Sequence, residues 1–153
     1  MDNTEHHSAL VGSVALAADH AGFHLKEQLK AVLQRLELRV TDLGTDSPDS
    51  TDYPAYGHAV AREVAESRVD CGVLLCGSGI GMAMAANRHK GVRAAVCHST
   101  EEAGYSRSHN DANILCMGAR IINLATAEDI LTTFMTTRFE GGRHEHRVMQ
   151  LEL

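Results

Sequence analysis

The sequence lacks any long apolar run, and no stretch approaches the roughly 20 residues that a helix needs to span a bilayer. Residues 1–7 are polar and acidic, without the basic start and apolar centre of a secretion signal. The four cysteines form no Cys-x-x-Cys pair and no framework of a small disulfide-bonded protein. These absences predict a cytoplasmic protein with reduced thiols and no membrane association.

Positive charge is also limited. The net charge is −6 at pH 7, which argues against nucleic acid as the main partner. Only three of the 14 basic residues are lysines, and arginine has the planar fork that suits phosphate and carboxylate groups. The chain of 153 residues has no internal repeat, linker or low-complexity tract. We therefore predict one domain over residues 13–153, preceded by a disordered extension over residues 1–12.

Apolar segments alternate with amphipathic ones along the chain. The near-continuous apolar runs are typical of strands that are buried on both faces. They predict strands over residues 13–18, 38–43, 71–75, 92–97 and 112–117. Helices are predicted over residues 21–36, 54–67, 82–87 and 126–137 and from residue 99, and the arginine-rich tail over 139–153 is expected to be partly helical. This alternation predicts an α/β protein with five parallel strands and helices on both faces of the sheet.

Polar residues gather where these strands end. Asp19 and His20 follow the first predicted strand, segment 76–81 follows the third, and Arg120 follows the fifth. Ligands of parallel sheets bind beyond the carboxyl ends of the strands. A purely structural domain does not need this density of polar groups, so we predict a ligand site at this edge of the sheet.

The segment 76–81, Cys-Gly-Ser-Gly-Ile-Gly, places a thiol beside backbone N–H groups at a helix start. These groups and the helix dipole favour negative charge, and the thiolate is the reactive form of cysteine. The segment is neither a dinucleotide fingerprint nor a P-loop, and a Cys-x5-Arg phosphatase loop would need arginine where Met82 stands. It is either a tight turn beside a buried cysteine, or an anion or oxyanion cradle with Cys76 as base or nucleophile.

Three other segments carry candidate residues. Asp19 and His20 are either a helix cap and a surface histidine, or groups that hold substrate hydroxyls and a phosphate. His109 suits proton transfer near neutral pH, and its candidacy depends on convergence with the other polar residues at one sheet edge. Arg143 and Arg147 lie four residues apart, so on a helix they would share a face and grip one phosphate, unless they are only a solvated basic tail.

A metal site is not expected. His144 and His146 are spaced as a His-x-His pair. No set of cysteines or carboxylates completes tetrahedral or octahedral ligation around that pair.

In their order along the chain, these motifs resemble type B ribose-5-phosphate isomerase, a family that also holds galactose-6-phosphate and allose-6-phosphate isomerases. The resemblance covers about residues 14–148. It rests on segments 18–22 (ADHAG), 51–54 (TDYP), 76–81 (CGSGIG), 85–87 (AAN), 108–111 (SHND) and 141–144 (GGRH). It implies a three-layer αβα Rossmann-like fold and no cofactor. It also implies a homodimer or homotetramer whose active sites draw residues from two subunits.

The resemblance assigns a role to each candidate residue. Cys76 matches the catalytic base, because Met82 stands where another branch of the family has a glutamate. Ser78 matches a hydroxyl near the reacting carbons, His109 matches a residue that helps to open the sugar ring, and Asp19 matches a group that holds substrate hydroxyls. The other substrate-binding positions are His20, Tyr53, Gly77, Gly79, Gly81, Asn110, Arg120, Arg143 and Arg147.

The function implied is interconversion of D-ribose 5-phosphate and D-ribulose 5-phosphate through an enediol(ate), a step of the pentose phosphate pathway. One base can move the proton between C1 and C2, N–H donors can stabilise the charged oxygen, and a clamped phosphate can fix the reacting carbons. A six-carbon substrate, allose 6-phosphate or galactose 6-phosphate, is the main alternative, and a four-carbon erythrulose phosphate is a further one. A non-catalytic nucleotide-binding α/β module is the alternative from another class of protein.

Overall fold

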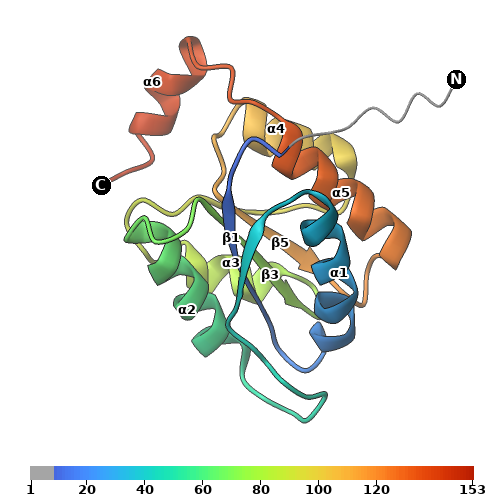
Figure 1. Cartoon of the computed structure of the whole chain (residues 1–153). Coiled ribbons are helices and arrows are strands. Elements are labelled where there is room, and N and C mark those ends of the chain that lie inside the picture. The colour runs from blue at the N-terminus through green and yellow to red at the C-terminus, as the bar shows by residue number, and fades with distance from the viewer. Residues whose placement is uncertain (1–8) are drawn as a thin grey trace, which may run out of the picture.

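The computed structural model describes residues 9–153 as a three-layer αβα fold (Figure 1). Its strands are β1 (Ser13–Ala18), β2 (Arg39–Asp42), β3 (Cys71–Cys76), β4 (Ala94–Val96) and β5 (Ile114–Gly118). Its helices are α1 (Phe23–Arg35), α2 (Tyr53–Ala65), α3 (Ile80–Ala86), α4 (Thr100–Ser108), α5 (Leu124–Thr136) and α6 (Arg143–Met149). The strands form one parallel sheet in the order β2-β1-β3-β5-β4, which confirms the predicted fold class.

The strands β1, β3 and β5 are buried on both faces of the sheet, whereas the edge strand β2 is largely exposed. Helices α1, α4 and α5 cover one face, and α2 and α3 cover the other. Figure 1 shows α1 and α5 together on one side of the strands and α2 on the opposite side. Along β1, Val14 and Leu16 point to the first core, whereas Ala15 and Ala17 point to the second. This two-sided burial explains why the sequences of β1, β3 and β5 are continuous apolar runs instead of alternating ones, and the edge strand β2, Arg-Val-Thr-Asp, departs from the predicted apolar run.

The chain ends differ from expectation in one respect. Residues 9–12, expected within a disordered extension, lie against the domain. The N–H of Leu10 donates a hydrogen bond to the Met135 carbonyl at 2.9 Å, and the N–H of Gly12 donates one to Asp70 Oδ2 at 2.8 Å. Residues 1–8 of the predicted extension are outside the described residues. The partly helical tail is present as α6, and no helix within residues 9–153 has the length and apolarity to cross a membrane.

Side-chain caps define two of the helix starts. Ser99 Oγ accepts a hydrogen bond from the N–H of Glu102 at 3.1 Å, so Ser99 is the N-cap of α4. Helix α5 starts before its predicted first residue, because Asn123 Oδ1 accepts from the N–H of Thr126 at 2.9 Å. Helix α3 begins at Ile80, directly after the glycine turn.

The strand order creates a switch point between β1 and β3. The chain passes from β1 outward to β2, and then returns to β3 on the other side of β1. Connections diverge at such a point and leave a crevice at the carboxyl ends of the strands. The N–H of Asp19 donates to the Leu75 carbonyl at 3.2 Å, and the N–H of Ala119 donates to the Cys76 carbonyl at 2.8 Å. These bonds hold the ends of β1, β3 and β5 side by side.

Candidate active site

A pocket of about 610 Å³ lies at the carboxyl ends of β1, β3 and β5. It brings together a large part of the candidate residues: Asp19, Tyr53, Cys76, Gly77, Ser78, Gly81 and Arg120. Its remaining lining residues, Ile80, Met84 and Ile121, were not anticipated from the sequence. The candidate residues at the ends of β1, β3 and β5 therefore come together at this edge of the sheet, as predicted.

The glycine turn after β3 holds the thiol of Cys76 in a fixed direction. The N–H of Gly79 donates a hydrogen bond to Cys76 Sγ at 3.1 Å. Gly79 has φ +80°, and a Cβ there would lie 2.9 Å from the carbonyl carbon of Met117, so only glycine fits. Gly79 shapes the turn and does not line the pocket. Within residues 9–153, no hydrogen bond uses the N–H groups of Gly77 and Ser78, so both are free for a ligand.

Cys76 differs from the other cysteines, all of which are free thiols. Burial raises the pKa of Cys71 to about 12 and the pKa of Cys97 to about 11. Burial also raises the pKa of Cys116 well above its ordinary value. These thiols stay protonated and away from the pocket, so Cys76 is the thiol that is placed to react with a ligand there.

Asp19 and His20 have different roles in the structure. Asp19 Oδ1 accepts hydrogen bonds from the N–H groups of Ala21 at 3.0 Å and Gly22 at 3.2 Å. These two hydrogen bonds resemble those of a helix cap, the first of the two roles considered for Asp19. They occupy Oδ1 alone, and no hydrogen bond within the described residues uses Oδ2. His20 does not line the pocket, because its Nδ1 lies 3.1 Å from the carbonyl oxygen and 3.2 Å from the N–H nitrogen of Thr51. It therefore holds the segment that leads into α2.

Tyr53 and Arg120 close the pocket on either side of the turn. A Cβ on Gly81 would lie 2.5 Å from Cζ of Tyr53, so the missing side chain lets the aromatic ring lie against α3. The N–H of Arg120 donates to the Gly77 carbonyl at 3.0 Å, and a Cβ on Gly77 would lie 3.2 Å from Arg120 Nη1. The guanidinium therefore lies against the turn, where it favours an anionic ligand.

The apolar rim of the pocket was missed by sequence reasoning. Ile80 and Met84 lie four apart on α3, on the face opposite Met82, which is fully buried. Their side chains are 50% and 61% exposed, and Ile121 is 55% exposed. Three large apolar side chains around the rim of this pocket form a patch of the kind that a partner covers. The available signal was the i, i+4 spacing of Ile80 and Met84.

His109 and Asn110 lie in a separate pocket of about 260 Å³, together with Arg147 and His144. The expectation that His109 converges with the other residues is wrong within one chain. The segment from α4 enters β5 at its amino end, so His109 belongs to the opposite edge of the sheet from Cys76. The two pockets share no lining residue.

The second pocket is built from stacked rings. The rings of His109 and His144 are stacked with centroids 4.3 Å apart, and Tyr105 stacks on His109 with centroids 5.0 Å apart. Arg143 is the first residue of α6, beside His144. Desolvation lowers the pKa of His144, and the neighbouring His109 and Arg143 lower it further.

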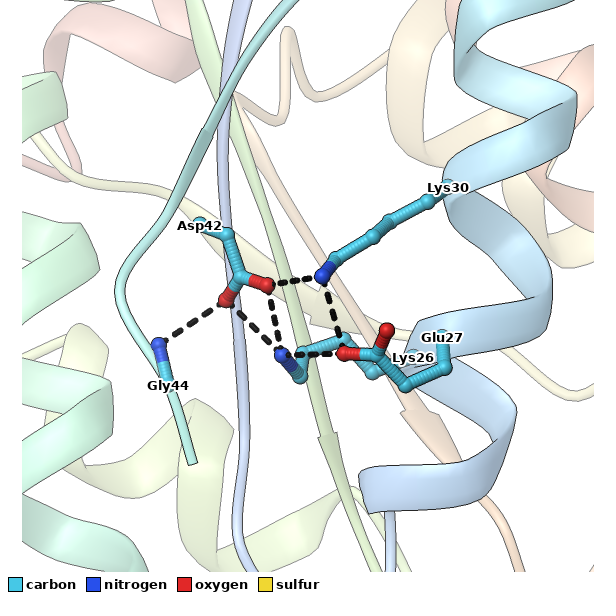
Figure 2. Close-up of polar contacts among 5 residues, drawn as sticks. All are labelled: Lys26, Glu27, Lys30, Asp42 and Gly44. Carbon is cyan, nitrogen blue, oxygen red and sulfur yellow. Dashed lines mark hydrogen bonds and ion pairs between the residues drawn. The ribbon is translucent and has the colours of Figure 1, made fainter. Parts of the chain in front are cut away.

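Figure 2 shows an ion-pair network that holds the end of β2 against α1. The side chain of Lys26 is fully buried, and its Nζ lies 2.8 Å and 2.7 Å from the two oxygens of Asp42 and 3.0 Å from Glu27 Oε1. Lys30 pairs with the same two carboxylates. Burial raises the pKa of Asp42, but the hydrogen bonds from the two lysines and from the N–H of Gly44 outweigh it, so the pKa lies below its ordinary value.

This network supports the active-site edge of β1. The N–H of Gly44 donates to Asp42 Oδ1 at 2.9 Å, and the N–H of Ala18 donates to the Gly44 carbonyl at 2.7 Å. The loop that begins at Gly44 continues to Thr51 and Tyr53. Lys26 is thus linked, through Asp42, to the segment that carries the aromatic wall of the pocket. Sequence reasoning gave Lys26 no role.

Comparison with known proteins places this architecture in a family. The family model described as Ribose/Galactose Isomerase matches residues 14–151. Ribose-5-phosphate isomerase B of Escherichia coli (strain K12) is 44% identical over 135 residues, which cover 88% of this chain and 91% of that protein. The similarity therefore extends from β1 into the residues after α6.

Solved structures show the same relationship. Ribose 5-phosphate isomerase B from Anaplasma phagocytophilum is 54% identical, with a TM-score of 0.89, and the match covers 94% of this chain and 99% of that one. Ribose-5-phosphate isomerase B from Mycoplasma genitalium, with bound ribulose-5-phosphate, is 38% identical, with a TM-score of 0.88, covering 91% and 93%. The described fold is therefore similar to these structures over nearly its full length.

Proposed function

The chain belongs to the ribose/galactose isomerase family, and on that premise we propose that it interconverts D-ribose 5-phosphate and D-ribulose 5-phosphate. The observation that carries this proposal is the pocket at the β1–β3 switch point, where a thiol, a carboxylate and a guanidinium surround one space. Relatives named ribose-5-phosphate isomerase B, one of them with bound ribulose-5-phosphate, support a five-carbon phosphosugar as the substrate.

Cys76 is the proposed general base. Isomerisation moves one proton between C1 and C2, and a single base on one face of the sugar can do both halves. The N–H of Gly79, 3.1 Å from Sγ, fixes the sulfur and stabilises negative charge on it. The unused N–H groups of Gly77 and Ser78 are donors for the enediolate oxygen, whose charge develops beside the same turn.

The polar walls of the pocket orient the sugar. Asp19 Oδ2 is available to accept hydrogen bonds from substrate hydroxyls, because only Oδ1 is used in the turn. Ser78 offers a hydroxyl beside the thiol, and Arg120 offers a cation to the phosphate. Holding the remote phosphate keeps C1 and C2 near Cys76, which lowers the entropic part of the barrier.

Ring opening requires a second copy of the chain in this proposal. His109, Asn110 and Arg147 lie together, but in another pocket of the same subunit. A partner that covers the apolar rim of Ile80, Met84 and Ile121 would bring its own His109 and arginines to the thiol. His109 would then move the proton that opens the sugar ring, and Arg143 and Arg147 would grip the phosphate.

The test is conversion of ribose 5-phosphate by the purified chain in excess EDTA, beside Cys76→Ala and the control Cys116→Ala. Loss of a general base costs about 10²–10⁴-fold in rate, so the kcat of Cys76→Ala should be lower than that of the wild type by that factor. Cys116→Ala alters a buried thiol on the next strand and should keep its turnover. If Cys76→Ala kept more than about a tenth of the wild-type kcat, Cys76 would not be the base.

A six-carbon phosphosugar is the second candidate, because the family model covers both ribose and galactose isomerases. The separation between the phosphate site and Cys76 decides between them. The same assay with allose 6-phosphate and galactose 6-phosphate ranks the substrates by kcat/KM. Absence of turnover with all three sugar phosphates, together with tight ATP binding, would favour a non-catalytic nucleotide-binding module instead.

A further inference from the structure

Helix α6 carries Arg143 and Arg147, yet packing holds it only weakly. Of its seven residues, His144 alone is buried. Figure 1 shows this helix apart from the layers of the sheet, with the chain end returning towards the domain. A helix of this length has little stability of its own, so its position depends on the contacts at its two ends.

The start of α6 is tied to the segment that carries His109. The N–H of Glu140 donates a hydrogen bond to the Ser108 carbonyl at 3.0 Å, and the ring of His144 stacks on that of His109. Both contacts lie before or within the first turn of the helix. They leave the position of the second turn, which carries Arg147, to other contacts.

Glu152 ties the other end of α6 to the domain. Its Oε2 accepts a hydrogen bond from the N–H of Gly91 at 3.1 Å, and its Oε1 lies 3.7 Å from Arg93 Nη1. The second distance is too long for a direct hydrogen bond, so the bond to Gly91 is the closer contact. The side chain of Glu152 is 34% exposed, so solvent partly screens its attraction to the guanidinium.

The loop that receives Glu152 is itself fixed to residues 109–113, the segment before β5. Asn113 Nδ2 donates a hydrogen bond to the Gly91 carbonyl at 2.8 Å, and Asn113 Oδ1 accepts one from the N–H of Arg93 at 2.8 Å. The Nε of Arg93 donates to the carbonyl of residue 111 at 2.9 Å. The loop and this segment therefore form one frame, and the end of α6 docks on it.

We propose that Glu152, through its hydrogen bond to Gly91, is a positioning residue that sets where α6 presents its arginines relative to His109. This inference rests on the proposed function, because it needs these side chains to act together at a partner's thiol. The phosphate and the reacting carbons of one sugar lie a limited distance apart, so the arginines and the ring-opening histidine must keep a matching separation. Glu152 itself touches no reacting atom. Its loss weakens the grip on phosphate in the ground state and the transition state alike.

Steady-state kinetics of the full chain with ribose 5-phosphate test this role. Glu152→Ala should raise KM by about 3-fold or more and keep kcat within about 2-fold, since interactions made equally in both states affect KM alone. Glu152→Gln should behave like the wild type, because its amide oxygen can still accept the hydrogen bond from Gly91. Glu145→Ala is the matched control, since it removes the same charge from an exposed residue of α6 outside the tether, and it should not raise KM.

A combined variant separates positioning from a general loss of stability. When Arg143→Ala and Arg147→Ala are both present, the arginines that Glu152 positions are gone, so adding Glu152→Ala should lower kcat/KM no further. An equal further loss in that background would overturn the proposal, as would an unchanged KM in Glu152→Ala alone. A KM of Glu152→Gln as high as that of Glu152→Ala would assign the effect to charge instead of the hydrogen bond, and would overturn it too.

Amide hydrogen exchange tests the tether without any need for activity. In Glu152→Ala, the amides of Gly91 and of residues 143–149 should exchange about 5-fold faster or more, because a hydrogen bond to a charged acceptor no longer opposes local opening. Glu152→Gln should exchange like the wild type, and unchanged exchange in Glu152→Ala would overturn the tether. A wild-type chain without isomerase activity would refute the proposed function, while the exchange results would still decide whether Glu152 holds α6.

Discussion

Subunit complementation gives a sharp test of how the two pockets combine. In one chain, Cys76 lies at the carboxyl edge of the sheet and His109 lies at the connection into the amino end of β5. If the active site forms between two subunits, each site takes Cys76 from one chain and His109 from the other. Two inactive variants, Cys76→Ala and His109→Asn, should then restore activity when their subunits are mixed.

The expected recovery follows from symmetry. In a closed two-fold dimer, random mixing of equal amounts makes half of the dimers mixed, and each mixed dimer has one intact site and one doubly altered site. About one quarter of all sites are then intact. Each variant alone should retain at most about 1% of the wild-type rate, since loss of an acid or base group costs 10²–10⁴-fold. The signal therefore exceeds the background by more than about 10-fold.

The assay is turnover of ribose 5-phosphate by co-expressed subunits, first as the unseparated mixture. Purification of the mixed dimers through separable tags should then raise the intact fraction to about one half. A mixture of Cys76→Ala with Asp19→Asn is the control, because both residues line one pocket of one chain and no mixed dimer has an intact site. No recovery for Cys76→Ala with His109→Asn would refute the shared site. Recovery in the control pair would mean that Cys76 and Asp19 of different chains can act in one site. That result would also refute the proposed arrangement, in which both residues come from the same chain.

Further predictions concern the support of the site and the phosphate clamp. Lys26→Met should lower the free energy of unfolding in urea by about 1–3 kcal/mol. This is less than the about 3–5 kcal/mol lost when a fully buried ion pair is broken, because Asp42 remains paired with Lys30 and partly exposed to solvent. Asp42→Asn should flatten the acid part of the stability curve. Burial raises the pKa of Asp42, but its hydrogen bonds hold that pKa below the unfolded value of about 3.9. Its stabilisation is therefore complete above that pH and lost as the pH falls through the folded pKa. Arg143→Ala should mainly raise KM for ribose 5-phosphate, and an unchanged KM would remove Arg143 from the phosphate site.

The fold and the first pocket could be predicted because their signals are local. The strands β1, β3 and β5 are continuous apolar runs, and Asp19, Cys76 and Arg120 each lie at or within two residues of the end of such a run. The register then places Ala18 beside Leu75 and Cys76 beside Gly118, so neighbouring strand ends carry their polar residues to one place. General rules for parallel sheets convert that local pattern into a site.

The burial of Lys26 could not be predicted in this way. A lysine between the apolar positions Leu25 and Leu29 of an amphipathic helix is normally solvent-facing, because desolvation of its charge is costly. Lys26 is buried because Asp42, on another element, accepts two hydrogen bonds from its ammonium group. That partner is adjacent only after α1 packs on the sheet, so no local spacing reports it.

The stack of His109 on His144 could not be predicted from local spacing either. Spacing suggested the pair His144 and His146, but residues two apart on a helix point to different faces. In α6, His146 instead lies 2.8 Å from the side-chain amide of Gln150, while His144 stacks on His109. The carboxylate that lies near both rings, Glu140, precedes α6, and His109 follows the last residue of α4. Which histidine of α6 meets His109 therefore depends on which face of this short helix is buried. That is a property of packing, and residue spacing in the sequence does not report it.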